Sequence, residues 1–200
     1  MPTTLPQDLY PDSLNRLPMV KREELDEQGK RALDAVLDPR ARSVAGLQGP
    51  GGIWMHSPKI AEVQREFIRL LRQENGFGDR LTELAILLAA RETNHQFEWT
   101  VHEPVALKAG LERQIVDVVK YRGPTEGLPK TEKLIIDFGR QLLREKKVDQ
   151  PLYAETERAL GRTGIVNLAG LIGYYAMTGI ILNAFDQHLK PGLEPLLPMP

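Results

Sequence analysis

The chain has 200 residues, of which 42% are hydrophobic and 26% are charged, as in an ordinary globular protein. It contains no cysteine, which excludes thiolate catalysis, disulfides, zinc–thiolate sites and iron–sulfur clusters. The formal net charge is −1, so no general positive field favours nucleic acid or anionic lipid as a partner. The segment Met1–Pro6 has neither a basic nor an apolar signal region. We therefore expect a cytoplasmic protein.

Prolines mark both ends of the chain. Those at positions 2, 6, 11 and 18 predict an extended N-terminal arm over residues 1–20. Those at positions 191, 195, 198 and 200 predict an irregular tail over residues 191–200. No stretch between them has the alternation of a half-buried strand. Residues 21–190 are therefore predicted to form a single all-α domain of about seven or eight helices.

The first helices are predicted from amphipathic patterns and start signals. The stretch Val20–Leu37 is charged and amphipathic and should end near Pro39. The segment Gln48–Gly52 predicts a flexible loop, because three of its five residues are glycine. Ser57 and Pro58 predict the start of a helix that continues towards Gly76.

The next helices are predicted by capping residues and apolar faces. Asp79 is expected to cap a helix with a broad apolar face, and Asn94 is expected to cap another from His95 to about Ala109. Gly110 is predicted to end that helix. Further helices are predicted at Glu112–Tyr121, at Thr131–Arg144 with Thr131 as the cap, and at Pro151–Leu160.

The segment Thr163–Phe185 contains no charged residue and is long enough to cross a bilayer. However, it carries polar residues and four glycines, and its two tyrosines lie in the middle rather than at the ends. We therefore expect no membrane partner. The segment is predicted to be a central helix buried on most sides, in the core or at a subunit interface.

Three ionisable side chains that could take part in catalysis or metal binding lie on one predicted helix face. His95, Glu98 and His102 are spaced i, i+3 and i+7, which places them within roughly 60° of one another on a helix. Trp99 lies beside them and indicates an apolar setting. Imidazoles beside a carboxylate can transfer protons near neutral pH, and the same groups can bind a divalent metal. The spacing alone is also that of a hydrogen-bonded polar face, so all three interpretations stay open.

Several segments of the chain resemble the carboxymuconolactone decarboxylase family, which includes the AhpD-type alkylhydroperoxidases. The resemblance runs from about residue 15 to residue 188. It is carried by Arg80–Leu87, Ala90–Arg91, Gln96–Trp99, His102, Ala106–Leu111, Leu171–Tyr175 and Leu182–Phe185, with Asn15–Pro18 and His56–Pro58 similar to the longer members. It implies an all-α, AhpD-like fold that assembles into homo-oligomers, commonly dimers, trimers or hexamers.

The resemblance also bears on chemistry. The peroxidase branch of the family uses a glutamate, a Cys-x-x-Cys pair and then a histidine. Glu83 and His102 match the glutamate and the histidine, whereas His95 and Glu98 stand at the two cysteine positions. Thiol peroxidase chemistry is therefore excluded, and the chain is similar to the non-redox branch.

The hypothesis that follows is a cofactor-independent enzyme of lyase or isomerase type acting on a small organic acid or lactone. His102 is predicted to be the acid–base group and Glu83 its orienting carboxylate, with His95 and Glu98 completing the catalytic site. The residues predicted to contact the substrate are Arg91 and Arg80, which would hold its carboxylate, together with Trp99 and Tyr175.

Two alternatives to the enzyme hypothesis stay open. The fold could serve as a non-catalytic oligomeric binding scaffold, or His95, Glu98 and His102 could be metal ligands. No phosphate-binding glycine motif and no basic stripe with aromatic residues is present, so we expect neither a nucleotide cofactor nor a nucleic-acid partner.

Overall fold

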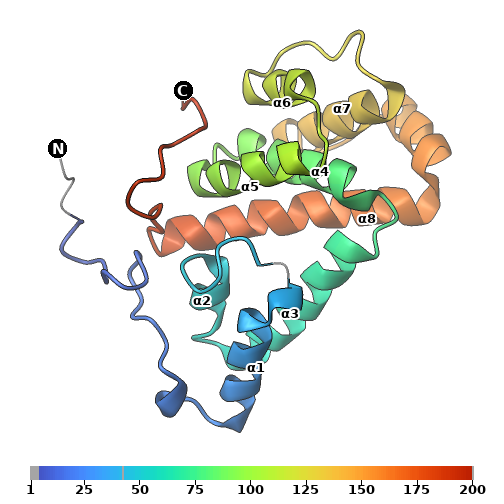
Figure 1. The fold of residues 1–200 in the computed structure, drawn as a ribbon. Coiled ribbons are helices and arrows are strands. Elements are labelled where there is room, and N and C mark those ends of the chain that lie inside the picture. The colour runs from blue at the N-terminus through green and yellow to red at the C-terminus, as the bar shows by residue number, and fades with distance from the viewer. Residues whose placement is uncertain (1–4, 42, 200) are drawn as a thin grey trace. The chain divides into compact units, whose positions relative to one another are not determined.

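The computed structural model describes residues 5–41 and 43–199 (Figure 1). These residues form eight α-helices and two short 3-10 helices, and their only strand-like pairing is a bridge between Tyr10 and Asn15. The all-α prediction is confirmed. The α-helices are α1 (Glu27–Leu37), α2 (Pro50–Trp54), α3 (Pro58–Gln73), α4 (Gly78–Glu92), α5 (Gln96–Lys108), α6 (Arg113–Lys120), α7 (Lys130–Arg144) and α8 (Gln150–Ala184).

The chain divides into two compact units. The first contains Met1–Arg69 and Ile180–Leu193, and the second contains Leu70–Gly179 and Glu194–Pro200. Both α3 and α8 therefore contribute residues to both units. The division predicted from the sequence, with one domain over residues 21–190 between an arm and a tail, stays a prediction.

The first unit has a small apolar core and shows two differences from the predicted helices. One cluster of buried residues in it consists of Ala32, Leu33, Met55 and Ala61. The helix α1 begins only at Glu27, because the Asp26 side chain accepts a hydrogen bond from the Gly29 amide at 2.7 Å and so caps the helix there. The loop predicted over Gln48–Gly52 is also partly wrong, since α2 begins at Pro50, a residue well suited to a first helical position.

Three predicted helix caps in the second unit are wrong. Asp79 lies within the first turn of α4, which begins at Gly78. Thr131 lies within α7, where Pro129 precedes the first helical residue. Asn94 precedes the residue that caps α5 and has a left-handed φ of +52°. In contrast, the predicted end at Gly110 is confirmed by its φ of +89°, which glycine adopts without strain.

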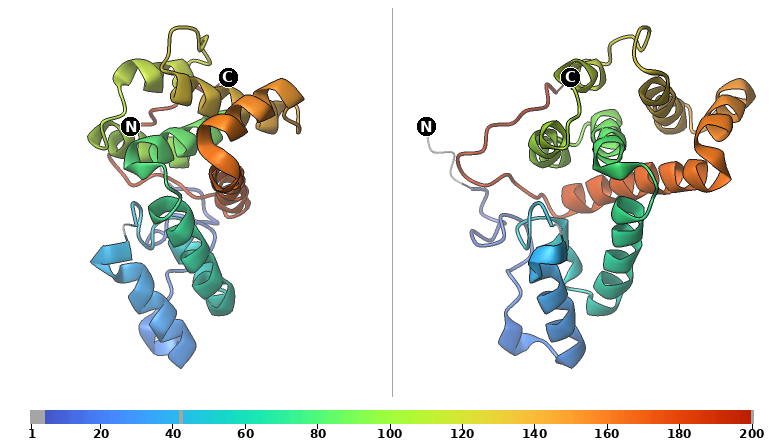
Figure 2. Two further views of the ribbon diagram at one scale, coloured as in Figure 1. Left: turned by 90° about the vertical axis from the view of Figure 1, so that its right-hand side faces the viewer. Right: turned by 45° about the vertical axis from the view of Figure 1, so that its right-hand side comes forward.

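The helix α4 forms the centre of the second unit. Residues 82–91 are all buried, and α4 lies between α5 and α7 in the right-hand view of Figure 2. Gly139 of α7 allows the close approach of these helices. A Cβ atom at this position would lie 2.3 Å from Leu88 Cδ2 and 3.1 Å from Ile172 Cδ1.

The helix α8 is interrupted at Gly161, whose φ of +72° and ψ of 171° are not helical. Among the described helices, α8 alone is long and apolar enough to cross a membrane, with a mean hydropathy of 1.7. Half of its apolar window is buried, which is a property of core helices in soluble proteins. This burial is less than the sequence predicts, because Val166 is 68% and Ile180 69% exposed. The cytoplasmic location stays a prediction.

Candidate active site

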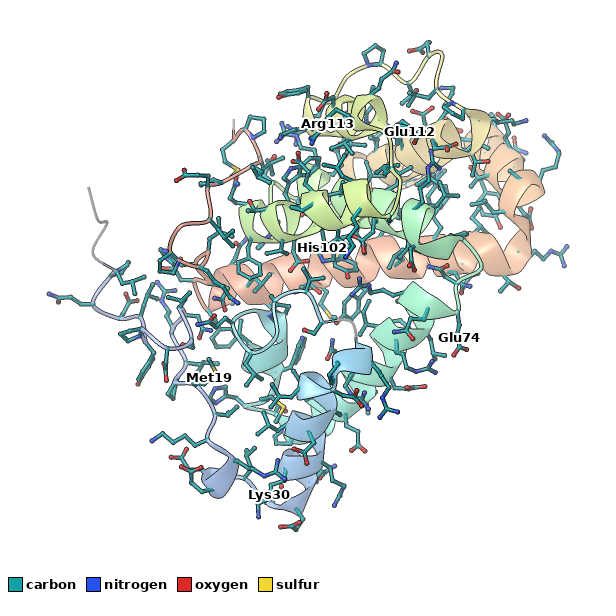
Figure 3. The ribbon with its side chains drawn as sticks, in the orientation of Figure 1. Met19, Lys30, Glu74, His102, Glu112 and Arg113 are labelled. Atoms are coloured by element: carbon teal, nitrogen blue, oxygen red, sulfur yellow. The ribbon has the colours of Figure 1, made fainter. Side chains whose placement is uncertain are left out.

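Glu83 of α4 and His102 of α5 form a buried pair at the centre of the second unit. The His102 Nδ1 atom lies 2.7 Å from Glu83 Oε2, and both side chains are at most 5% exposed. His102 is labelled in Figure 3, on α5 beside α8. An ionised carboxylate only accepts hydrogen bonds, so the ring donates from Nδ1 and directs Nε2 to its other side.

Arg72, from the last turn of α3, is bound to the same carboxylate. Its guanidinium NH2 group donates a hydrogen bond to Glu83 Oε1 at 3.0 Å, and 19% of its side chain is exposed. Burial alone raises the pKa of Glu83. The charges and hydrogen bonds of His102 and Arg72 outweigh that effect, so the pKa of Glu83 lies below its usual value. Glu83 is therefore held as a carboxylate between two donors.

Glu98 faces the other nitrogen of the imidazole. Its Oε2 atom lies 3.5 Å from His102 Nε2, and 3% of its side chain is exposed. Burial raises the pKa of Glu98, and the negative charge of Glu83 acts in the same direction. The positive charges of His102 and Arg72 offset this only in part. The two carboxyl groups on either side of one imidazole thus have opposite pKa shifts.

The charges in this cluster leave one proton to be shared. Arg72 and Glu83 compensate each other, which leaves His102 and Glu98 as a second pair. This pair is neutral overall when it holds one proton between them, either as imidazolium with carboxylate or as imidazole with carboxylic acid. The proton can move between the two groups of this pair without creating a net buried charge.

Tyr175 of α8 packs against the imidazole. The two ring centroids are 5.3 Å apart and the ring planes meet at 89°, an edge-to-face contact. Burial raises the pKa of Tyr175 well above its ordinary value, so its hydroxyl stays protonated at neutral pH. Tyr174 lies edge-on to Tyr175, with centroids 5.5 Å apart. Tyr175 therefore lies beside the imidazole, and its predicted contact with the substrate stays a prediction.

His95 lies at the start of α5, next to the turn that carries Glu98, and has a structural role there. It is the residue that caps α5, and its Nδ1 atom accepts a hydrogen bond from the Glu98 amide at 3.4 Å. Its ring lies against α8, where a Cβ atom at Gly179 would lie only 2.9 Å from His95 Cδ2. His95 therefore fixes the first turn of α5, the turn that carries Glu98.

The metal alternative gains no support from this geometry. Across the described ranges 5–41 and 43–199, no group of three or more His, Asp or Glu side chains is arranged to hold a metal ion. Only Glu98 and His102 of the three predicted ligands form a close pair, since His95 Nδ1 is directed at the helix backbone.

The other predicted contact residues have different partners. Arg80 forms ion pairs with Glu132 and Glu112. Arg91 donates hydrogen bonds to the Asn94 side chain and the Pro198 carbonyl. Trp99 is fully buried, and its Nε1–H group donates to Glu103 at 2.5 Å.

Sequence reasoning missed Arg72, the cation that is bound to Glu83. Arg72 is one of several arginines on α3, and no motif surrounds it. Its role depends on how the end of α3 meets α4, which a helical pattern does not specify.

Comparisons with known proteins support the fold. No family model matches the chain, and no curated protein matches it. Among solved structures, an uncharacterised peroxidase-related protein from Ralstonia eutropha JMP134 with an alkylhydroperoxidase AhpD core has a TM-score of 0.69. It is 12% identical over 90% of this chain and 94% of its own.

A second similar structure is a cysteine-to-alanine variant of the debrominase Bmp8 in complex with 2,3,4-tribromopyrrole. Its TM-score is 0.66, at 11% identity over 86% of this chain and 90% of its own. The chain therefore has the all-helical fold of the AhpD core, and at these identities the comparisons speak for the fold alone.

Proposed function

We propose that this chain is a cofactor-independent enzyme of carboxymuconolactone decarboxylase type, acting on a small organic acid or lactone. The observation that carries this proposal is the buried row Glu83–His102–Glu98, in which one imidazole lies between two carboxyl groups with opposite pKa shifts. General acid–base catalysis needs such a group near its substrate, with a proton that can be given and regained near neutral pH.

The chemistry would proceed in two stages. In the first, the bond between the ring carbon and the substrate carboxylate breaks, CO₂ leaves, and the electron pair enters a conjugated carbonyl. In the second, His102 or Glu98 gives a proton to the carbon that carries the resulting negative charge. Glu83 would hold the imidazole in the correct orientation and stabilise its protonated form.

The proposal also requires a group that binds the substrate carboxylate. A carboxylate substrate needs a cation, and Arg72 is the arginine that is bound to the His102–Glu83 pair. The roles predicted for Arg80 and Arg91 stay predictions, because the partners of these side chains lie elsewhere. Tyr175 would offer an apolar ring face and a hydroxyl donor.

The test is release of CO₂ from γ-carboxymuconolactone and related lactone acids by the wild type and by Glu98→Gln. Glu103→Gln is the matched control, because Glu103 is also a buried glutamate of α5 but pairs with Arg113 and Lys120. We expect turnover by the wild type and the control, and a loss of at least about 100-fold in Glu98→Gln. Substrate binding without turnover in every protein would favour the scaffold alternative instead.

We also propose that the chain forms a homo-oligomer. In support, α3 exposes an apolar row in which Ile60 is 51%, Val63 71% and Phe67 49% exposed, spaced i, i+3 and i+7. Light scattering coupled to gel filtration would test this, and Val63→Asp should lower the molar mass. A wild-type molar mass equal to that of a single chain would contradict the proposal.

A further inference from the structure

A second buried carboxylate lies at the C-terminal end of α4 and is surrounded by arginines. Glu92 has 1% of its side chain exposed. The Nε atom of Arg144 lies 2.6 Å from its carboxylate, that of Arg122 3.7 Å and that of Arg140 3.9 Å. These arginines come from α7 and from the turn after α6, so the fold gathers them around one acid.

A fourth arginine adjoins this group. Arg91 is 7% exposed, and its guanidinium donates to Asn94 Oδ1 and to the Pro198 carbonyl. Arg122 donates to the same Asn94 oxygen at 2.9 Å and to the Arg91 carbonyl at 3.1 Å. Asn94 thus holds the two guanidinium groups side by side.

The donors of this arginine cluster (Arg91, Arg122, Arg140 and Arg144) are not all satisfied by the protein. The Nε–H groups of Arg91 and Arg140 are buried and have no hydrogen-bond partner. A buried donor without an acceptor destabilises a fold, and a buried charged donor does so more strongly. The Nε atom of Arg140 still lies 3.9 Å from Glu92 Oε1, so it is the Nε–H group of Arg91, beside Arg122, that indicates an acceptor from outside the chain.

The cluster also lacks negative charge. Four guanidinium groups against the single Glu92 leave a net charge of +3. Two further acids are near, but Asp137 is paired with Lys133 at 2.6 Å and Glu145 lies on the exposed end of α7. Burial and the charges of neighbouring arginines lower the pKa of both Arg91 and Arg140, as expected where like charges are crowded together.

The two sides of the arginine cluster differ in their charge. Arg140 and Arg144 also line a cleft of about 430 Å³ between α7 and the first part of α8. Four acidic side chains share that cleft, which makes it unfavourable for an anion: Asp137, Glu145, Asp149 and Glu155. On the other side of the cluster, Glu92 is the described acid whose charge acts on Arg91. This side is reachable from solvent, because Arg122 has 31% and Arg144 44% of its side chain exposed.

We propose that Arg91, Arg122 and Arg144, with Asn94 between the first two, form a binding site for a small tetrahedral oxyanion with the chemistry of phosphate. A carboxylate carries one charge, whereas phosphate carries about −1.5 to −2 and offers more acceptor oxygens to guanidinium groups converging from several elements. The site lies nine residues along α4 from Glu83, or about 13 Å at the helical rise. It is therefore separate from the His102 site and does not depend on the proposed function.

The test measures anion binding by the full chain. Sodium phosphate is titrated at constant ionic strength, balanced with sodium chloride, and followed by calorimetry and by the unfolding midpoint. We expect saturable binding and a midpoint raised by about 5–10 °C at one hundred times Kd. A titration with glycerol 3-phosphate distinguishes the two possible ligands of the site. Tighter binding of this ester would point to a phosphorylated metabolite rather than free phosphate.

Three variants assign the site. Arg122→Gln, at a partly exposed position, and Arg91→Gln should each weaken phosphate binding at least about tenfold, whereas Arg113→Gln, an arginine paired with Glu103, should bind as the wild type does. Glu92→Gln removes the competing carboxylate and should bind phosphate at least about tenfold more tightly. Equal midpoint shifts in phosphate and chloride, or equal losses in Arg122→Gln and Arg113→Gln, would overturn the proposal.

Discussion

The N-terminal half of α4 (the first end) and its last turn (the second end) each carry a glutamate with a buried side chain, and the two differ in how its charge is balanced. Glu83 has one arginine and one imidazole as partners, and the imidazole has a second carboxyl group on its far side. Glu92 has three arginines within 4.0 Å and a fourth beside them. At the first end the protein supplies all the opposite charge, with one proton to move. At the second end the positive charge of the arginines exceeds the single negative charge of Glu92, which makes that end suited to binding an anion rather than to proton transfer.

The largest expected effect concerns proton transfer at the first end. His102→Ala removes the group between the two carboxyl groups, and we expect kcat for the lactone substrate to fall by about 10²- to 10⁴-fold. His56→Ala is the control, since its ring lies at an exposed position and its Nε2 atom lies 3.0 Å from the Pro18 carbonyl. Full activity in His102→Ala would contradict the proposed mechanism.

Stability measurements would compare the two ends directly. Glu83→Gln leaves the largely buried Arg72 without its carboxylate, and we expect a loss of about 3–5 kcal/mol in the free energy of unfolding. Glu92→Gln should lose only about 1–3 kcal/mol, because two of the three arginines around it, Arg122 and Arg144, are partly exposed and water can solvate them. Urea unfolding of both variants gives the two values. Equal losses would show that the two ends do not differ in the way described.

The packing of α4 between its two ends can be tested separately. Gly139→Ala places a methyl group where Leu88 already lies, so we expect a loss of about 1–3 kcal/mol from overpacking. Gly173→Ala is a suitable control, because no atom lies within 4 Å of the position its Cβ would take. Urea unfolding of both variants is the measurement. A stable Gly139→Ala variant would mean that α4 and α7 can separate without loss.

The smallest effect is a pH dependence with a defined sign. Burial raises the pKa of Glu98 in the folded state, so its contribution to stability is complete below the unfolded value of about 4.3 and is lost as pH rises through the folded pKa. The stability of Glu98→Gln relative to the wild type should therefore increase with pH in this window.

For Glu103→Gln we expect the opposite pH dependence of stability. Burial raises the pKa of Glu103, but Lys120, Trp99 and Arg113 outweigh it and lower that pKa. Wild-type Glu103 therefore contributes stability above pH of about 4.3, and Glu103→Gln should become relatively less stable as pH rises. Two curves with the same slope would contradict the assignment of these shifts.

The helices could be predicted from sequence because their apolar periodicity and their ends are local features. The helix that follows Ser57 and Pro58 and the end at Gly110 needed only neighbouring residues. The sequence predicts the cap of α5 one residue too early. Asn94 is a residue type that often caps helices, but His95 has the required backbone geometry and accepts the amide hydrogen bond. The residue type alone does not show which of two adjacent polar residues will cap a helix.

The candidate site was only partly predictable for the same physical reason. Glu98 and His102 lie on one helix, so their spacing already placed them on one face. Glu83 was named from a resemblance and not from spacing, and Arg72 was missed because its contact with Glu83 joins two helices. Arg91 and Arg80 have the charge to hold a substrate, but a sequence does not show which carboxylates or carbonyls already occupy their donors.

The contact between the C-terminal tail and α5 has a consequence for how the protein folds. The Leu196 amide donates to Thr100 Oγ1 at 3.1 Å, although the two residues are 96 positions apart, and Leu197 is buried. A chain made from its N-terminus contains Thr100 long before Leu196, so this contact closes a loop of 96 positions and forms only once Leu196 has been made. Until then the face of α5 that this segment contacts is uncovered, and in the folded protein hydrogen exchange should find the amides of this segment among the first to open.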